Sequence, residues 1–150
     1  MKETKLVLLA ADLAGYTKAC AHLDALSIAQ FLDRWYRQAA PIITSRGGRI
    51  VKFMGDGVLI EFASAVNAVT AAIELQRKMS EANADLPDQS RIVLRIGINL
   101  GDVIGEGADI YGEGVNIAAR LEALAEPGGL CISGKIHDEV RGKVDTVFED

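Results

Sequence analysis

The sequence predicts an α+β fold: one mixed, largely antiparallel sheet with helices packed on one of its faces. Three observations predict it. An apolar run near the N-terminus is typical of a central strand, two strand-like runs flank a tight turn, and a later segment alternates with the period of a half-buried strand. Helical stripes separate these strands, so the predicted order is β, α, β-hairpin, α, β, α, β, α within one domain spanning residues 1–150.

The central strand and the first long helix come first along the chain. Residues 5–11 form the apolar run, which is expected to be buried on both faces of the sheet. Apolar side chains then recur at helical spacing over residues 26–45. Pro41 is expected to kink the last turn of this helix or to end its regular part, and Gly47-Gly48 is expected to stop it.

A hairpin and a second helix follow. Strands over residues 49–54 and 58–62 flank Gly55-Asp56-Gly57, a composition typical of a tight turn. Ser64 is expected to cap the next helix by accepting a backbone hydrogen bond. The side chains expected on one face of that helix are Val66, Val69, Ile73 and Gln76.

The second half of the chain begins with a polar loop around residues 83–90 and a strand over residues 91–99. The alternation in that strand is more typical of antiparallel pairing than of a strand buried on both faces. The elements expected after it are a glycine-rich stretch (101–114), a helix (115–125) ended by Pro127-Gly128-Gly129, a strand (130–133) and a helix (135–140).

Charge and composition exclude several classes of function. The net charge of −5 gives no basic footprint, so binding of nucleic acid or of an anionic membrane is not favoured. No apolar stretch is long enough to span a bilayer, and the N-terminus does not resemble a signal peptide. Cys20 and Cys131 lack metal-ligand spacing and are expected to be reduced thiols, as in a cytoplasmic protein.

Two aspartates, Asp12 and Asp56, are the first candidate site residues. Each closes an apolar strand-like run and is expected to sit in a glycine-flanked turn. A carboxylate at the end of a buried strand is unfavourable unless a cation holds it there, and a pair of them suits a divalent metal that also grips phosphates. Taken singly, Asp12 also fits a helix N-cap and Asp56 a plain hairpin turn, so both alternatives stay open.

Four further polar residues carry a second set of alternatives. Lys52 lies in a hairpin strand, on the face expected for Ile50, where lysines ordinarily reach solvent. Asp109 is expected in a loop and alone indicates nothing. Asn116 and Arg120 are four residues apart, so both project from one helix face, which a solvated surface would also explain.

Joint occurrence favours the functional interpretation. The segments ADLAGYT (11–17), GGRIVKFMGDG (47–57), RIGINLG (95–101) and DIYGEGVNIAAR (109–120) resemble the class III nucleotide cyclase catalytic domain, in its bacterial adenylate cyclase form. The resemblance runs in the same order over nearly the whole chain. It implies the ferredoxin-like, palm-type fold of that family and the conversion of ATP to 3′,5′-cyclic AMP and pyrophosphate.

The resemblance also implies roles. Asp12, Asp56 and the backbone carbonyl of Leu13 would hold two divalent cations per site, Mg²⁺ or Mn²⁺. The positions implied for substrate are Lys52 and Asp109 for the base, the backbone amides of Gly15 and Tyr16 for the phosphates, Asn116 for the ribose and Arg120 for the transition state.

The two base-reading positions also have a physical rationale of their own. Adenine offers an acceptor at N1 and a donor at its 6-amino group, so a lysine and a carboxylate, as at Lys52 and Asp109, complement it. Guanine presents the opposite polarity and would leave both side chains facing like groups, which a buried polar site rejects strongly. ATP is therefore preferred over GTP.

The resemblance implies a homodimer, because family active sites form between two domains and this chain carries both sets of residues. Two departures from the family pattern matter. Tyr111 replaces a tryptophan common in the family, which is a conservative aromatic change. The chain also ends at Asp150, short of a final strand pair that carries a phosphate-binding lysine in the family, and this loss is expected to weaken ATP binding and catalysis. A nucleotide-binding regulatory domain with little turnover and a plain dimerisation module therefore remain as alternatives.

Overall fold

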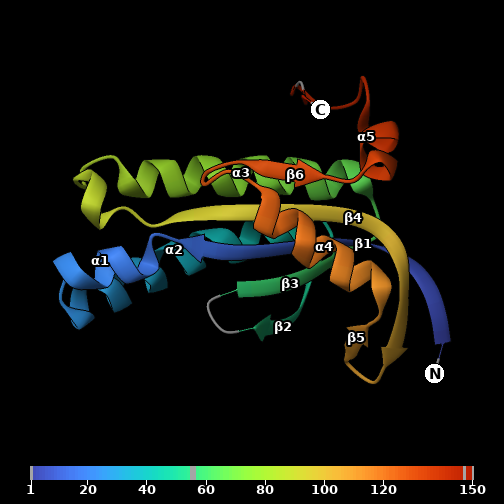
Figure 1. Cartoon of the computed structure of the whole chain (residues 1–150), viewed down its shortest axis with the longest axis horizontal. Helices are drawn as coiled ribbons and strands as arrows, with labels where there is room; N and C mark the ends of the chain where they lie inside the picture. Colours follow the sequence, from blue (N-terminus) through green and yellow to red (C-terminus); the bar gives the residue numbers. More distant parts are fainter. Residues whose placement is uncertain (1, 55–56, 147, 150) are drawn as a thin grey trace.

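The computed structural model of the chain describes residues 2–54, 57–146 and 148–149, and shows a twisted sheet flanked by helices (Figure 1). Its elements are β1 (Lys2–Ala14), α1 (Tyr16–His22), α2 (Ala25–Ser45), β2 (Arg49–Met54), β3 (Gly57–Phe62), α3 (Ala65–Asn83), a 3₁₀ turn (Asp88–Ser90), β4 (Val93–Glu106), β5 (Asp109–Tyr111), α4 (Glu113–Leu124), β6 (Leu130–Ile132) and α5 (Gly134–Val140). The strands run in the order β2-β3-β1-β4-β5, and β6 pairs with β4.

The sheet is mixed and largely antiparallel, as predicted. Strand β1 lies at its centre, antiparallel to β3 on one side and to β4 on the other, while β6 is parallel to β4. Residues 7–11 of β1 are buried, which confirms the prediction of a central strand covered on both faces. The α+β fold class is therefore confirmed.

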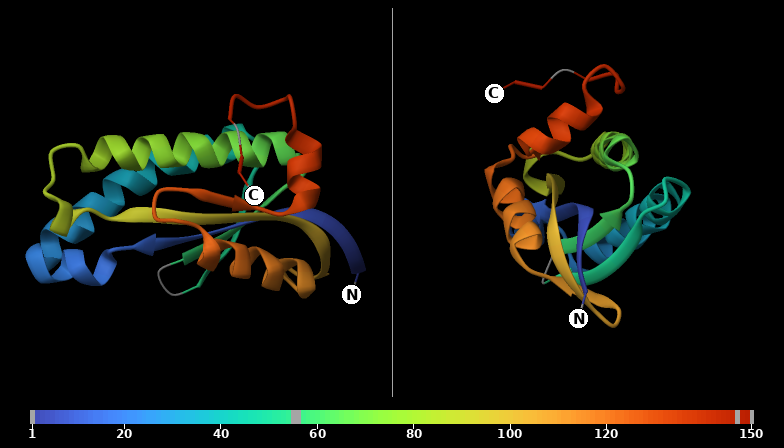
Figure 2. Two further views of the ribbon diagram at one scale, coloured as in Figure 1. Left: turned by 45° about the horizontal axis from the view of Figure 1, so that its top comes forward. Right: turned by 90° about the vertical axis from the view of Figure 1, so that its right-hand side faces the viewer.

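The prediction that the helices pack on one face is wrong. Side chains of β1 alternate between two clusters: Val7 and Leu9 join the cluster made with α2, α3 and α5, whereas Leu8 and Ala10 join a cluster made with α4. Figure 2 shows α4 on the opposite side of the sheet from α2 and α3. The physical reason is that a central strand apolar on both faces needs a cover on each.

Local signals placed the long helices correctly. Asp24 caps α2 by accepting a hydrogen bond of 2.7 Å from the Ser27 N–H, and the helix continues past Pro41 to Ser45. Gly47, with φ of 79°, then takes the left-handed conformation that follows many helix ends. Ser64 caps α3, as predicted, by accepting a bond of 3.1 Å from the Asn67 N–H.

The buried face of α3 differs in part from the predicted one. Val69 is fully buried, but the inward side consists mainly of Ala65, Ala68, Ala71, Ala72, Leu75 and Met79. Small alanines let the helix axis approach the sheet, so the stripe is centred on them. Val66 and Ile73 are only partly buried, and Gln76 donates to two backbone carbonyls, those of Leu94 and Gly129, each at 3.0 Å.

The glycine-rich stretch over residues 101–114 contains strands that the predicted order of elements lacks. Strand β4 continues through Glu106 and turns back as β5, with Ile104 opposite Tyr111 and Glu106 opposite Asp109. Asp109 therefore begins a strand and does not lie in a loop. Glycines 101 and 105 are compatible with extended backbone, so their number alone did not distinguish a strand from a loop.

Candidate active site

Asp12 lies within β1, not in a turn, and the N-cap position of α1 belongs to Gly15. Its cross-strand partners are Gly57 on β3 and Arg95 on β4. Arg95 donates from Nε to Asp12 Oδ1 at 3.2 Å and from an Nη atom to Oδ2 at 3.0 Å. The helix-cap interpretation of Asp12 is therefore wrong, and a cation does hold this carboxylate at the end of the strand.

Leu13 follows Asp12 within β1, Gly15 is the N-cap of α1, and Tyr16 is the first residue of that helix. Gly15 has φ of 82°, and a Cβ atom there would lie 2.9 Å from the Arg91 carbonyl oxygen, so both backbone conformation and space require glycine. The Gly15 carbonyl accepts the first hydrogen bond of α1, from the Ala19 N–H at 2.8 Å. Asp12, Leu13 and Tyr16 together line one side of a recess of about 390 Å³ whose other walls are mainly apolar.

Asp56, the second predicted metal ligand, lies outside the described residues. Its neighbour along the chain, Gly57, is the β3 residue that pairs with Asp12.

Lys52 and Asp109 lie together, as a joint role requires. The Lys52 Nζ is 2.9 Å from Asp109 Oδ1 and 3.4 Å from the Ile110 carbonyl oxygen. The hydrogen bond from Lys52, followed by the one from the Ile110 N–H at 2.7 Å, lowers the pKa of Asp109 below its usual value. The pair is half exposed, with 32% of the Lys52 side chain and 52% of the Asp109 side chain accessible, so it is open to a ligand.

A bulge in β2 explains how Lys52 reaches Asp109. The register shifts between Ile50, which pairs with Ile60, and Lys52, which pairs with Leu59. Ile50 packs on the α2–α3 cluster, whereas Leu59 belongs to the α4 cluster. The prediction that Lys52 shares a face with Ile50 is therefore wrong, because the extra residue of the bulge turns Lys52 to the other face.

Asn116 and Arg120 project from the exposed side of α4, as their spacing predicted. The opposite side is buried through Gly114, Val115 and Ala118. This helix approaches the sheet closely because Gly97 lies beneath it: a Cβ atom at Gly97 would lie 2.2 Å from the Glu122 nitrogen. The location of Gly97 in β4 therefore determines how near the Asn116–Arg120 face can come to the strands.

Tyr111 has a polar anchor at the position where the family commonly has tryptophan. Its hydroxyl donates to the Glu106 carboxylate at 2.6 Å, and this bond raises the pKa of the Tyr111 phenol. The contact spans the β4–β5 hairpin, so it supports the strand that carries Asp109.

The donor set at Asp12 fits a hard divalent ion. It offers the Asp12 carboxylate, and carboxylate oxygens are among the ligands that Mg²⁺ and Mn²⁺ prefer. Among the residues that the structure describes, no three His, Cys, Asp or Glu side chains gather as a cation cage. That is compatible with Mg²⁺, which commonly binds through one or two carboxylates and completes its shell with water and substrate phosphates.

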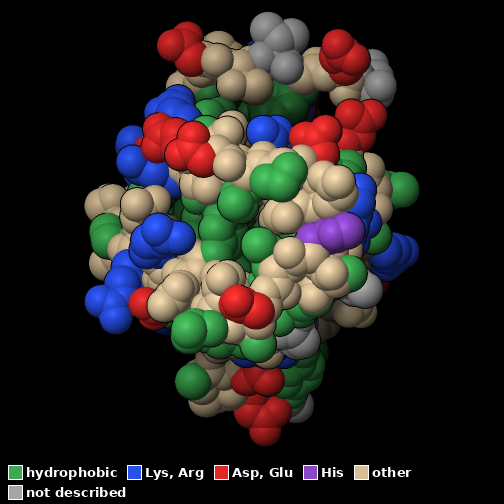
Figure 3. Space-filling view, turned by 90° about the vertical axis from the view of Figure 1, so that its left-hand side faces the viewer, with side chains coloured by type: hydrophobic (Ala, Val, Ile, Leu, Met, Phe, Trp, Pro, Cys, Tyr) green, Lys and Arg blue, Asp and Glu red, His purple; other side chains and the backbone are tan. Residues whose placement is uncertain are grey.

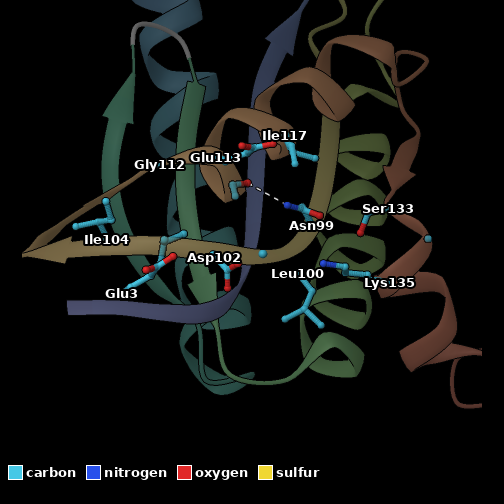
Figure 4. A pocket seen from close by; sticks show the side chains of 14 residues that line it. Glu3, Asn99, Leu100, Asp102, Ile104, Gly112, Glu113, Ile117, Ser133 and Lys135 are labelled. Carbon is cyan, nitrogen blue, oxygen red and sulfur yellow. Dashed lines mark hydrogen bonds between the residues drawn. The ribbon is translucent and has the colours of Figure 1, made fainter.

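A hollow of about 720 Å³ lies between β4, the start of α4 and the segment Ser133–Lys135, where Asn99 donates to the Gly114 carbonyl at 3.1 Å (Figure 4). None of its lining residues belongs to the predicted site.

On the face in Figure 3, Lys and Arg side chains are interspersed with Asp and Glu around apolar groups. No helix in the described part of the chain is long and apolar enough to cross a bilayer.

The family is decided by comparison with known proteins. The model of the adenylate and guanylate cyclase catalytic domain matches residues 2–149. The chain belongs to this family. A putative adenylate cyclase 3 from Rhizobium meliloti is 48% identical over 143 residues, which are 95% of this chain and 24% of the relative, so the chain spans about a quarter of that protein's length.

Solved structures of cyclases share the fold. An adenylate/guanylate cyclase/hydrolase from Silicibacter pomeroyi superimposes with a TM-score of 0.88 at 40% identity, over 100% of this chain and 87% of that one. The guanylyl cyclase Cya2 superimposes with a TM-score of 0.78 at 28% identity, over 92% of this chain and 79% of that one. The predicted cyclase fold is thus confirmed. Because solved structures with this fold include guanylyl as well as adenylyl cyclases, the fold alone does not identify the nucleotide base.

Arg95 is the residue that the sequence interpretation missed. In the sequence it lies in the predicted strand over residues 91–99, with no role assigned to it. A signal was present: a carboxylate ending a buried strand requires a nearby cation, and an antiparallel neighbour is the natural source. Only the β1–β4 register, which places Arg95 opposite Asp12, identifies which cation it is.

Proposed function

We propose that this domain is an adenylate cyclase, converting ATP to 3′,5′-cyclic AMP and pyrophosphate at sites shared between two copies of the chain. The observation that carries the proposal is the 2.9 Å ion pair between Lys52 and Asp109, because it presents a donor beside an acceptor on one surface. A donor and an acceptor this close can address two adjacent atoms of a base edge at once.

Base choice follows from the polarity of that pair. The Lys52 ammonium would donate to adenine N1, and the Asp109 carboxylate would accept from the 6-amino group. The Asp109 carboxylate is charged at neutral pH and is therefore an acceptor, and the hydrogen bond from Lys52 lowers its pKa further. Guanine would oppose a donor to Lys52 and an acceptor to Asp109, and leaving such groups unpaired disfavours it by about 1–3 kcal/mol each.

Asp12, the Leu13 carbonyl and Asp56 are the proposed ligands of two divalent ions, Mg²⁺ or Mn²⁺. When bound, these ions would activate the ribose 3′-hydroxyl and offset the charge of the departing pyrophosphate. The backbone amides of Gly15 and Tyr16 would lie against the phosphates, as the family resemblance implies. The Asp12 carboxylate lies near the end of β1, and 24% of its side chain is accessible, so an ion could reach it.

Asn116 and Arg120 are proposed to act on the ribose and the transition state. Asn116 would orient the sugar through its amide, and Arg120 would meet the negative charge that develops at the α-phosphate. Both residues lie on the exposed side of α4, where a bound nucleotide can reach them.

Dimerisation is part of the proposal because the family resemblance implies active sites that form between two domains, and this chain carries both sets of residues. In the proposed symmetric homodimer, one copy supplies the metal ligands and the other supplies the base readers with Asn116 and Arg120. The competing proposal is a regulatory domain that binds nucleotide with little turnover.

The test is a product assay with ATP or GTP in the presence of Mn²⁺ or Mg²⁺, comparing the wild-type chain with Asp56→Ala. Asp85→Ala, in the exposed loop after α3, is the matched control. Cyclic AMP from ATP that disappears in Asp56→Ala, but not in the control, supports the proposal. Metal-dependent ATP binding without product would favour the regulatory alternative, and equal product from GTP would contradict the base assignment.

A further inference from the structure

The geometry of Asp12 points to a second property of the site, which rests on the proposed function. We propose that Arg95 occupies the Asp12 carboxylate in the nucleotide-free chain and competes with the divalent ion for it. Metal and nucleotide would then load together, because the polyphosphate offers Arg95 a new anionic partner as the ion takes its place.

The first observation is that both oxygens of Asp12 are engaged. Nε of Arg95 lies 3.2 Å from Oδ1 and an Nη atom lies 3.0 Å from Oδ2. Such a two-point contact between guanidinium and carboxylate is stronger and more directional than a single ionic contact. An ion that binds Asp12 must therefore share or displace these bonds.

The second observation is that the contact is built into the sheet. Asp12 and Arg95 are directly opposite on β1 and β4, two strands whose antiparallel pairing runs from Lys2 opposite Gly105 to Ala14 opposite Val93. The sheet register therefore holds the Arg95 guanidinium beside the Asp12 carboxylate before a divalent ion arrives. The pair is half-buried, with 24% of Asp12 and 32% of Arg95 accessible, so solvent weakens their attraction less than at an open surface.

The third step concerns charge. A divalent ion on Asp12 would face the positive guanidinium within a few ångströms, and like charges at that distance repel. The two proposed carboxylate ligands, Asp12 and Asp56, carry two negative charges, fewer than the three positive charges of one divalent ion and the guanidinium together. A triphosphate can neutralise the remainder, because its oxygens bind the ion and also accept the two-point contact of an arginine. Arg95 would thus disfavour metal alone and favour metal with nucleotide.

The experiment measures Mn²⁺ binding to the nucleotide-free chain from the electron paramagnetic resonance signal of free Mn²⁺. Arg95→Gln is expected to bind Mn²⁺ at least tenfold more tightly than wild type, and Asp12→Asn to lose most binding. Arg91→Gln is the matched control, because Arg91 carries the same charge but pairs with Asp88 and the Leu86 carbonyl. It is expected to leave the Mn²⁺ affinity unchanged.

A second titration separates this role from a merely structural one. At saturating Mn²⁺, the affinity for 3′-deoxy-ATP, which cannot cyclise, is expected to fall at least fivefold in Arg95→Gln. Opposite changes for metal and nucleotide support the proposal, whereas a fall in both affinities would show general damage and overturn it. Arg95→Lys, whose single ammonium cannot hold both oxygens, is expected to change both affinities in the same directions by less.

Two failures remain distinguishable. If Arg95→Gln binds Mn²⁺ as wild type does while Asp12→Asn binds it poorly, the competition is absent but the metal site stands. If Asp12→Asn also leaves Mn²⁺ binding unchanged, Asp12 is not a metal ligand, and the proposed function loses its metal site together with this inference.

Discussion

Lys52 and Asp109, from two different hairpins, form one ion pair with Nζ 2.9 Å from Oδ1. The β2 bulge turns Lys52 toward β5, and the β4–β5 hairpin brings Asp109 to meet it. A bulge in one hairpin and the position of a second hairpin therefore bring this donor and acceptor together, and the proposed preference for ATP depends on the pair.

Removal of the donor should reduce the use of ATP. In Lys52→Met, kcat/KM for ATP is expected to fall about tenfold to a hundredfold, since an unpaired polar group costs about 1–3 kcal/mol. The preference for ATP over GTP should fall with it. Steady-state rates with both nucleotides measure the effect. Lys78→Met, on the exposed side of α3, is the control, and an equal loss there would show that the effect is not specific.

The pKa of Asp109 should depend on Lys52. The folded-state pKa is lowered, so any stability from the pair is present above the unfolded-state pKa and is lost as the pH falls through the folded-state value. The carboxylate is exposed, so little change in unfolding free energy is expected. A carbon-13 titration of the Asp109 carboxyl should show its pKa rising in Lys52→Met. The same pKa in both proteins would contradict the assigned cause.

Gly97 should be required for the position of α4. In Gly97→Ala the new Cβ would meet the Ala118 oxygen at 2.5 Å as well as the Glu122 nitrogen, and both are backbone atoms that cannot turn away. We expect a loss of about 1–3 kcal/mol in unfolding free energy, measured by urea denaturation. Activity should also fall, because α4 carries Asn116 and Arg120.

The control for that substitution lies on the same strand. A Cβ atom at Gly105 would have only the Ile110 Cγ2 within reach, at 4.0 Å, which is ordinary contact. Gly105→Ala is therefore expected to change stability by less than about 0.5 kcal/mol. If both variants were equally stable, the close approach of α4 at Gly97 would not be limiting.

Features set by neighbouring residues were predictable from the sequence. The Ser64 cap, the end of α2 before Gly47-Gly48 and the hairpin of β2 and β3 each depend on contacts within a few residues. The single-face spacing of Asn116 and Arg120 was predictable for the same reason, because helical geometry alone fixes it.

Features set by register were not predictable. The sequence does not reveal the bulge that turns Lys52 away from Ile50, nor the pairing that places Arg95 opposite Asp12. The location of α4 on the second face also depends on tertiary packing over Leu8 and Ala10. The site's residue types were visible in the sequence, whereas their cross-strand partners required the structure.

The most direct test of the central claim mixes two inactive variants. Asp12→Ala removes a proposed metal ligand, and Arg120→Ala removes the proposed transition-state contact. If two copies share each site, a mixed dimer keeps one intact site, and equal mixing should restore roughly a quarter of wild-type cyclic AMP production. Each variant alone should be nearly inactive. Mixed samples that form dimers yet make no more cyclic AMP than either variant alone would contradict the shared adenylate cyclase site.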